Sequence, residues 1–573
     1  MEKSALSNGY EFTQGSGYLL PEYPFVKPPE IVSGQVIRHP IVIVGGGITG
    51  LTLACSLARL GIAAVLLDED NTVGVKGASS RGICYTQKSL EIFHRLGIYE
   101  AIAKKGIQWS VGRTFAGQDE VYSFDLRAQS NFNLSSQPPF INIQQFYIEG
   151  YLVERIQQLG AVDIRWSSRV TAFSQNKAGA LLTVSTPAGN YDIAADHVVD
   201  ATGGHSPFHQ WAGATVESQK GDDRWCIADV RFSTRPPVER HTWIEAPFNE
   251  NRAVWQHLMA DDVWRIDYQM APNADPQYVS REDVVRERLT RQFGPDVAVE
   301  IVWVGPYAYR SQCVNQLRIG RVFFLGDAVK TVSPFGARGG NTGIADADNL
   351  ACKLAAVQLG HTTAKLLDSY HEERFEAAAQ NVQVTNRTAR FLRAPDGPER
   401  LFRNAVISLA KRHPFARALV NTGRMAVANT YTRSGVCGPA GGVSVQNVAI
   451  WFDAAGKNPG TLNDLINWCE GRFLLLVFGR IAAMDVPRLR KLAHRLPVRV
   501  IQVVRPDAQG LTQPVAVEHV YDMNGLLRQA VQAQALKWVV IRPDAYLAGC
   551  GDGGPNWSSQ VTAVLFKASG ADA

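Results

Sequence analysis

The stretch Ile41–Asp68, IVIVGGGITGLTLACSLARLGIAAVLLD, decides the fold of this chain. An apolar run ends in three glycines, an Ala- and Leu-rich segment follows, and a second apolar run ends in an acid. This succession predicts a βαβ unit. Gly45, Gly47 and Gly50 form GxGxxG between strand and helix, and Asp68 stands where a ribose-binding carboxylate is expected. The stretch therefore predicts dinucleotide binding at the start of the helix.

GxGxxG alone does not distinguish NAD from FAD. A nicotinamide-binding fold would continue as a succession of βα units. Instead, runs such as RWCIADVRF, RAVWQHLMA and DVWRIDYQM predict an inserted antiparallel sheet over residues 213–314. A second glycine-rich block, SPFGARGGNTGIADADNL, follows at Ser333–Leu350, between the strand RVFFLGDA and a helix. Its bare backbone allows N–H groups to approach an anion or a carbonyl of a ligand.

Composition excludes several classes of function. With 573 residues, of which 46% are hydrophobic and 19% charged, the chain has room for about two to four globular domains. The net charge of +5 is small and no Lys/Arg block is interleaved with aromatics, so no nucleic-acid partner is expected. The eight cysteines lie singly, without CxxC or a Cys/His cluster, so no metal site is expected. No segment resembles a signal peptide or a membrane span, which predicts a cytoplasmic protein.

The patterns divide this α/β multidomain chain into five expected segments. The first is rich in Gly, Pro and Tyr, and either an ordered arm or a disordered tail fits it. The last contains the runs RFLLLVFG, VRVIQVVRP and WVVIRPDAYLA, which predict a small α/β module. The segments are an N-terminal extension (1–39), the first part of the dinucleotide-binding domain (40–212), a β-sheet substrate domain (213–314), the second part with a helical region (315–445), and the C-terminal module (446–573).

Four separated segments together resemble the class A flavoprotein aromatic hydroxylases, the family of para-hydroxybenzoate hydroxylase and phenol hydroxylase. They are GxGxxG, SSRGICYTQKSLEIFHRLGI, INIQQFYIEGYLVERI and the block at residues 320–354. The resemblance implies a Rossmann-like FAD-binding fold with an inserted antiparallel substrate domain and a C-terminal thioredoxin-like domain. That last domain lacks CxxC, which excludes dithiol chemistry and favours a structural or dimer-contact role.

The resemblance also implies an activity. Members of this family reduce FAD with NADPH or NADH, capture O2 as the flavin C4a-hydroperoxide and hydroxylate an activated ring. We therefore expect a single-component monooxygenase that acts on a small phenolic or hydroxybenzoate-like aromatic, and a homodimer. The sequence fixes neither the substrate and ring position nor the choice between NADH and NADPH.

The family pattern assigns cofactor-binding residues. Asp327 would bind the ribityl chain of FAD. The amides near Gly339, Gly340 and Asn341 would face flavin N1 and the C2 carbonyl, where the helix dipole stabilises the reduced anionic flavin. The backbone of Pro334 would lie close to substrate and flavin.

The family pattern assigns cofactor contacts to two further residues, and this sequence departs from the pattern in two places. Arg81 would contact the FAD phosphates or the incoming nicotinamide, and Gln145 would bind the cofactor; a surface charge and an exposed helix residue are the competing interpretations. Thr202 and His209 replace the aspartate and arginine of a fingerprint tied to FAD and NAD(P)H, and Lys330 replaces a histidine. The altered segment at Thr202 keeps open the alternative of an FAD-dependent oxidase, dehydrogenase or halogenase.

The catalytic side chains are expected on the inserted sheet. On DVWRIDYQM, Arg265 and Asp267 share one face and Tyr268 lies on the other. If the first face covers the flavin, Arg265 could bind a substrate carboxylate and Asp267 could relay a proton; if the second does, Tyr268 could contact the phenol. Ordinary sheet packing is the competing interpretation. Further candidates are His257, Tyr307 and Tyr309.

Overall fold

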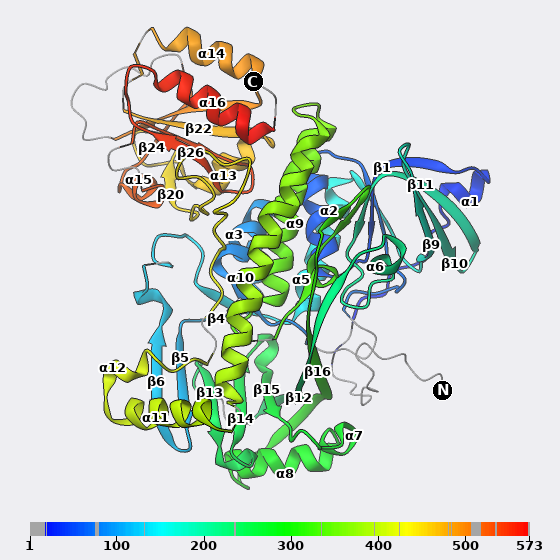
Figure 1. The fold of residues 1–573 in the computed structure, drawn as a ribbon, viewed down its shortest axis with the longest axis vertical. Coiled ribbons are helices and arrows are strands. Elements are labelled where there is room, and N and C mark those ends of the chain that lie inside the picture. The colour runs from blue at the N-terminus through cyan, green and yellow to red at the C-terminus, as the bar shows by residue number, and fades with distance from the viewer. Residues whose placement is uncertain are drawn as a thin grey trace.

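A computed structural model describes residues 18, 20–74, 80–130, 132–233, 236–333, 335–394, 396–422, 425–479, 481–482, 484–505, 517–532 and 536–570. Figure 1 shows three sheet-containing bodies around two long helices, α9 (Gly339–Gln358) and α10 (Asp368–Leu392). The C-terminal body lies near one end of α9, and the sheet formed by the middle of the chain lies at the opposite end of the molecule. Among the described residues, no helix combines the length and apolar character needed to cross a bilayer.

The first body contains the predicted βαβ unit. Strand β1 (Ile37–Val44) leads into α2 (Ile48–Arg59), and β2 (Ala64–Leu67) pairs with β1 in parallel. The C-terminal half of β1 and all of β2 are buried, as expected for strands covered on both faces. The sheet order is β17-β18-β11-β1-β2-β8, with β10 and β9 continuing from β11. The added strands are β8 (Val162–Arg165), β9 (Arg169–Gln175), β10 (Ala180–Thr186), β11 (Gly189–Asp200), β17 (Arg318–Ile319) and β18 (Val322–Phe324).

Helices pack around this sheet and carry the site residues at their ends. Helix α2 contacts both α5 (Gln145–Leu159) and α9, and α3 (Gln87–Leu96) contacts α9. A small sheet precedes α5, with the order β3-β7-β4. Its strands are β3 (Cys84–Thr86), β7 (Phe140–Asn142) and β4 (Ile107–Trp109), and the short helices α1 (Pro29–Ser33), α4 (Tyr99–Lys105) and α6 (Phe208–Trp211) complete this body.

The inserted sheet is mainly antiparallel and has the order β19-β16-β12-β15-β14-β13-β5-β6. The runs expected to form strands lie in β12, β14 and β15, as predicted. The sheet also contains β5 and β6, which precede the expected segment 213–314, and β5 pairs with β13 in parallel. The strands are β5 (Val111–Ala116), β6 (Asp119–Asp125), β12 (Val216–Phe232), β13 (Arg240–Ala246), β14 (Arg252–Leu258), β15 (Trp264–Gln269), β16 (Val299–Val314) and β19 (Lys330–Thr331).

One face of the inserted sheet is covered by α7 (Pro276–Val279) and α8 (Glu282–Phe293). Residues of β12, β14 and β15 on this side form an apolar core with Val279, Val285 and Leu289. The opposite side packs against α11 (Pro398–Arg412), α12 (Pro414–Arg417) and the loop before α9. The two faces of the sheet therefore have different neighbours.

The C-terminal body is the small α/β module expected from the sequence. Its seven strands have the order β21-β20-β24-β23-β22-β25-β26. Two apolar cores occupy opposite faces of β22 (Phe473–Phe478), because alternate side chains of that strand point to different sides. Helices α13 (Leu462–Trp468) and α15 (Leu526–Ala530) lie on one face, and α14 (Val486–Arg495) and α16 (Trp557–Ser569) on the other. The other strands are β20 (Ala449–Trp451), β21 (Pro459–Thr461), β23 (Val498–Val504), β24 (His519–Tyr521), β25 (Trp538–Ile541) and β26 (Leu547–Gly551).

Candidate flavin site

The glycines of GxGxxG occupy three different environments. Gly45 has a φ of +108°, and a Cβ there would lie 2.4 Å from Ala201 O. A Cβ on Gly50 would lie 2.0 Å from Gly45 O, so this glycine allows the helix to pack closely. At Gly47 the nearest atom is Glu149 Oε1, 4.0 Å away. Gly45 and Gly50 are thus required by the protein itself, whereas the bare backbone at Gly47 faces open space that a ligand can occupy.

Asp68 lies directly after β2 and holds the glycine loop. Its carboxylate accepts hydrogen bonds from the backbone N–H groups of Gly46 and Asp70. Burial raises the pKa of Asp68 to about 7 in spite of these hydrogen bonds. The position beside the loop suits the ribose contact predicted from the motif.

The second glycine-rich block forms the start of α9. A Cβ on Gly339 or on Gly340 would find nothing within 4 Å. The N–H groups of a first helical turn have no intrahelical partner, so they can donate to a ligand there. The Asn341 side chain accepts hydrogen bonds from Thr86 N at 2.9 Å and Ser89 Oγ at 2.7 Å, and thereby ties the helix start to α3. Pro334 lies outside the described residues, as does the side chain of Tyr309.

These two patches of bare backbone, each next to open space, fit a bound dinucleotide such as FAD. Asp327 lies between them in sequence, in the turn that follows β18. Its side chain is accessible to solvent, yet the surrounding protein raises its pKa by desolvation, while Arg81 and Lys330 favour its ionised form. A carboxylate that is surrounded by protein atoms and still reached by solvent is expected at a position where a ligand binds.

Gln145 is hydrogen-bonded to the backbone of Gly82, the residue after Arg81. Arg81 has a φ of +50° and is exposed, and its carbonyl accepts a hydrogen bond from Arg265 Nη1. Gln145 is buried rather than exposed; its Oε1 accepts from Gly82 N at 3.2 Å, and its Nε2 donates to Glu149 Oε1 at 2.8 Å. Gln145 therefore holds the backbone next to Arg81, and its direct contact with the cofactor stays a prediction.

The two faces of β15 separate the catalytic candidates. Tyr268 is fully buried on the α8 side, where its hydroxyl donates to Gln292 Oε1 at 2.8 Å. The packing of α8 thus directs Tyr268 away from Arg81, and the alternative in which it contacts the phenol is set aside. Arg265 lies on the other face, with its Nε 2.9 Å from Asp267 Oδ1. The same face carries Trp255, which contacts Phe335 in the loop before α9.

His257 and Tyr307 belong to the same neighbourhood as Arg265. His257 is buried with its Nδ1 3.9 Å from Cys84 Sγ. Burial, together with the charges of Arg240 and Arg265, lowers the pKa of His257 well below its usual value, so the ring is neutral at physiological pH. Burial raises the pKa of Tyr307 to about 12, and the charge of Asp327 adds to this shift.

Asp229 belongs to the site but was not predicted from the sequence. Asp229 is fully buried on β12, where its carboxylate accepts hydrogen bonds from Tyr18 OH at 3.1 Å and Ser80 Oγ at 3.2 Å. Burial raises the pKa of Asp229 to about 6. Lys330, noted in the sequence as a departure, forms a buried ion pair of 3.0 Å with Asp346. Only the alternation of the sheet could have indicated Asp229, since it faces the same side as Arg265.

The segment after β11 is organised by Asp200. This buried carboxylate accepts hydrogen bonds from Thr202 Oγ1 at 2.7 Å and from Ser206 Oγ at 2.6 Å. His209 Nε2 lies 2.7 Å from Ala328 O, next to Asp327. Thr202 and His209 therefore shape the backbone of the site, whatever their effect on nicotinamide reactivity.

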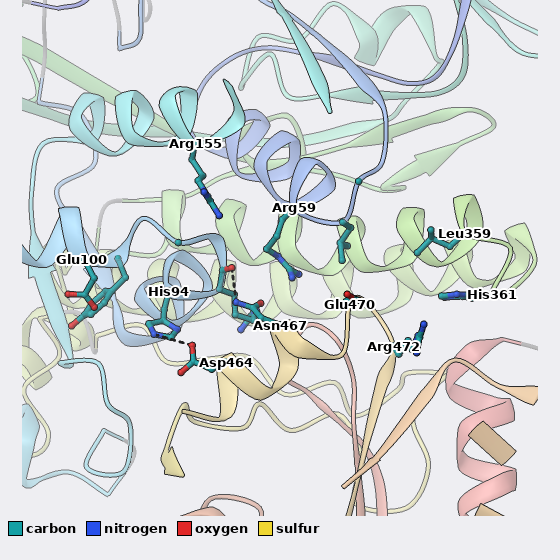
Figure 2. A pocket seen from close by; sticks show the side chains of 15 residues that line it. Arg59, His94, Glu100, Arg155, Leu359, His361, Asp464, Asn467, Glu470 and Arg472 are labelled. Atoms are coloured by element: carbon teal, nitrogen blue, oxygen red, sulfur yellow. Dashed lines mark hydrogen bonds and ion pairs between the residues drawn. The ribbon is translucent and has the colours of Figure 1, made fainter. Parts of the chain in front are cut away.

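A separate cavity of about 870 Å³ lies between the first body and the C-terminal module. Figure 2 shows Arg59 and Arg155 reaching towards it from α2 and α5, opposite Asn467 and Glu470. Since α2 has 12 residues and begins at the glycine loop, Arg59 lies about 18 Å from that loop at 1.5 Å per residue. Arg155 Nε donates to Leu96 O at 3.1 Å, at the C-terminal end of α3, where the helix dipole stabilises a cation. This cavity is therefore not the flavin site.

Comparison with known proteins agrees with this geometry. A family model described as FAD binding domain matches residues 38–385, and one described as HcaD C-terminal domain matches residues 453–563. A flavin-dependent monooxygenase of Mycobacteroides abscessus is 31% identical over 348 residues, covering 59% of this chain and 72% of the relative. A 3-(3-hydroxy-phenyl)propionate/3-hydroxycinnamic acid hydroxylase of Burkholderia vietnamiensis is 23% identical over 537 residues, covering 89% of this chain and 93% of the relative.

The fold of the whole chain also has solved counterparts. The crystal structure of the flavin-dependent monooxygenase PieE, in complex with FAD and substrate, covers 94% of this chain and 100% of its own, with a TM-score of 0.77 and 20% identity. This likeness confirms the predicted fold class, and the thioredoxin-like assignment of the C-terminal module stays a prediction. Because the FAD binding domain model spans more than half of the sequence, the chain belongs to the FAD binding domain family.

Proposed function

We propose that this protein is an FAD-dependent, single-component monooxygenase that hydroxylates a phenolic or hydroxybenzoate-like aromatic with NAD(P)H and O2. One observation carries the proposal: bare backbone faces open space both at Gly47 and at the start of α9. The relatives named as a flavin-dependent monooxygenase and as hydroxylases of hydroxyphenyl acids support the same reaction class.

The chain's own residues have separable tasks in this proposal. FAD, when bound, would supply the redox chemistry with NAD(P)H and O2. The first-turn amides of α9 would stabilise negative charge on the flavin, and Asp327 and Arg81 would hold its ribityl chain and phosphates. Asp267 Oδ1 is fixed by Arg265 Nε, so Oδ2 would accept the phenolic proton and make the ring more nucleophilic. The bulky residues around the sheet would exclude water.

The test is NAD(P)H oxidation by FAD-loaded protein across a panel of phenols and hydroxybenzoates, with product mass and peroxide quantified together. We expect oxidation to be stimulated by one class of aromatic, with a gain of one oxygen atom in the product. Suppose instead that the protein binds FAD tightly but that NAD(P)H does not reduce this FAD, whether or not an aromatic is added. This result would contradict the monooxygenase. The segment at Thr202 would then favour the alternative, an oxidase, dehydrogenase or halogenase on this scaffold.

The finer properties are proposed from the family resemblance. We take NADPH or NADH as the reductant, a homodimer as the assembly and the cytoplasm as the location. Comparing kcat/KM for the two nicotinamides, sedimentation of the holoprotein and fractionation of the source cells would test these three points separately.

A further inference from the structure

Buried arginines in this molecule are almost always matched by an oxygen acceptor. Among the described residues, six arginines are buried: Arg95, Arg165, Arg240, Arg338, Arg374 and Arg542. Four of them form ion pairs, namely Arg95, Arg165, Arg374 and Arg542. Arg338 donates to Asn381 Oδ1 at 2.7 Å. Arg240 is the exception.

The Arg240 guanidinium has only a weak partner within the described part of the chain. Its Nη1 contacts Met425 Sδ, and a thioether sulfur is a poor acceptor. Its Nε is buried without a hydrogen-bond partner among the described residues. Burial lowers the pKa of Arg240, and the carboxylate of Asp267 offsets this shift in part. That carboxylate is already bound by Arg265.

A buried, uncompensated charge is unfavourable by several kcal/mol, so proteins rarely retain one without a use. In Arg240 the contact with Met425 engages Nη1, and the buried Nε has no hydrogen-bond partner among the described residues. A guanidinium binds a carboxylate through two parallel hydrogen bonds along one of its edges. A substrate carboxylate would therefore satisfy both the charge and the donors.

The surroundings of Arg240 suit an aromatic acid. The guanidinium carbon lies 5.9 Å from the ring centroid of Trp255, which is stacked on Trp225 at 4.7 Å. Phe335, in the loop before α9, lies edge-on to Trp255 at 4.8 Å. His257 and Cys84 complete the polar side, and the carbonyl of Cys84 accepts a hydrogen bond from Asn341 at the helix start. Arg240 is thus close to the proposed flavin position and to an apolar aromatic wall.

Resting on the proposed function, we propose that Arg240 is the carboxylate-binding residue and that the natural substrate is an aromatic acid. Arg265 was a candidate for this role on the condition that its face of β15 covers the flavin. Arg265 is instead occupied by Asp267 and by the carbonyl of Arg81. The acid group would thus be anchored on β13, at the side of the sheet where it meets the loop before α9.

The test measures ligand binding to the FAD-loaded protein through the change in flavin absorbance. Hydroxybenzoates and hydroxyphenylpropionates are compared with their primary amides, which keep shape and remove charge. We expect the acids to bind at least about tenfold more tightly than the amides, the size expected for a charged hydrogen-bond pair. Arg240→Met should remove this preference, and Arg240→Lys should restore part of it.

Arg113→Met is the matched control, because Arg113 lies on the neighbouring strand β5 and pairs with Glu239 and Glu120. It should leave the preference for acids unchanged. Affinity for the acids should also stay flat between pH 5.5 and 8.5, because a carboxylate is ionised throughout this range.

Three results would overturn the proposal. Equal binding of acids and amides by the unaltered protein is the first, and equal loss of both in Arg240→Met is the second. The third is affinity that rises towards the pKa of the phenol, which would identify an ionised phenol as the partner. Hydroxylation of neutral phenols in any of these cases would leave the monooxygenase intact, whereas a protein that takes up no FAD would contradict the monooxygenase itself.

Discussion

At the scale of single residues, the glycines at the start of α9 separate ligand binding from folding. Gly340→Ala places a methyl group where no protein atom lies within 4 Å. Alanine is the better helix former, so the free energy of unfolding of the apoprotein should stay equal or rise by up to about 1 kcal/mol. The affinity for FAD should fall at least about tenfold, because the methyl group occupies the space next to the flavin. Fluorescence titration with FAD and urea unfolding of the apoprotein measure the two effects.

Gly50→Ala is the contrasting variant. Its methyl group would meet Gly45 O at 2.0 Å, so the apoprotein itself should be destabilised. Equal FAD affinity in Gly340→Ala and the unaltered protein would show that the cofactor lies elsewhere.

Asp68 gives the apoprotein a defined pH dependence. Burial raises its pKa from 3.8 to about 7, so between these values the folded state keeps a proton that the unfolded state has lost. Stability must then decrease as the pH rises through this window, by on the order of 2–4 kcal/mol. In Asp68→Asn this loss should be absent, so the variant should gain stability relative to the parent between pH 4.5 and 7.5. Parallel stability curves for the two proteins, measured by urea unfolding, would contradict the assignment.

The sequence predicted site residues of a type with few structural roles, such as glycine. It could not decide which of several arginines on the inserted sheet binds a substrate. GxGxxG and the glycines of α9 could be read directly, because only bare backbone permits such close approach. Arg240 was not predicted, since an arginine at the start of a strand is ordinary until its lack of an acceptor is seen. Arg265 was a candidate for the carboxylate role because alternation places it on one face with Asp267, and alternation does not show that the two side chains form an ion pair.

At the scale of elements, α9, α10 and the turn after β25 are joined by one buried carboxylate. Glu373 on α10 is fully buried, and it binds Lys353 of α9 at 2.8 Å and Arg542 Nη2 at 2.9 Å. The two cations hold the pKa of Glu373 well below its usual value. Glu373→Gln should cost about 3–5 kcal/mol of unfolding free energy, because it leaves buried cations uncompensated.

Glu399→Gln is the control for this prediction. Glu399 pairs with Arg390 on the surface, where the Arg390 side chain is 71% and the Glu399 side chain 38% exposed. Its loss should leave the urea midpoint close to that of the unaltered protein. Similar urea midpoints for the two variants would mean that the Glu373 cluster contributes no more than a surface pair.

Elements with local patterns were predictable, and pairings between distant segments were not. The βαβ unit and the runs in β12, β14 and β15 follow from periodicity within a few residues. The parallel pairing of β5 with β13 joins strands that are more than a hundred residues apart, and nothing in either strand encodes the partner. The same limit left the choice between the two faces of β15 open, because α8 decides it by covering one of them.

At the scale of the whole molecule, the C-terminal module is attached to the FAD domain by polar contacts as well as by a small apolar cluster of Ala377, Tyr431 and Tyr546. Asn463 Nδ2 donates to Glu91 O at 2.9 Å and Asn467 Nδ2 to Arg95 O at 3.1 Å, both on α3. Arg542 adds the buried pair with Glu373. Directional contacts of this kind fix one orientation of the module, and each depends on the others being in place.

We therefore expect the module and the FAD domain to unfold in a single calorimetric transition. Arg542→Met removes the buried ion pair at the contact but leaves both apolar cores of the module intact, so the module should keep its own fold while its coupling to the FAD domain weakens. The expected result is two resolved transitions. Arg499→Met, which breaks the surface pair with Glu518 inside the module, should retain the single transition. A single transition in Arg542→Met, lowered no further than in Arg499→Met, would show that coupling between the domains does not depend on this cluster.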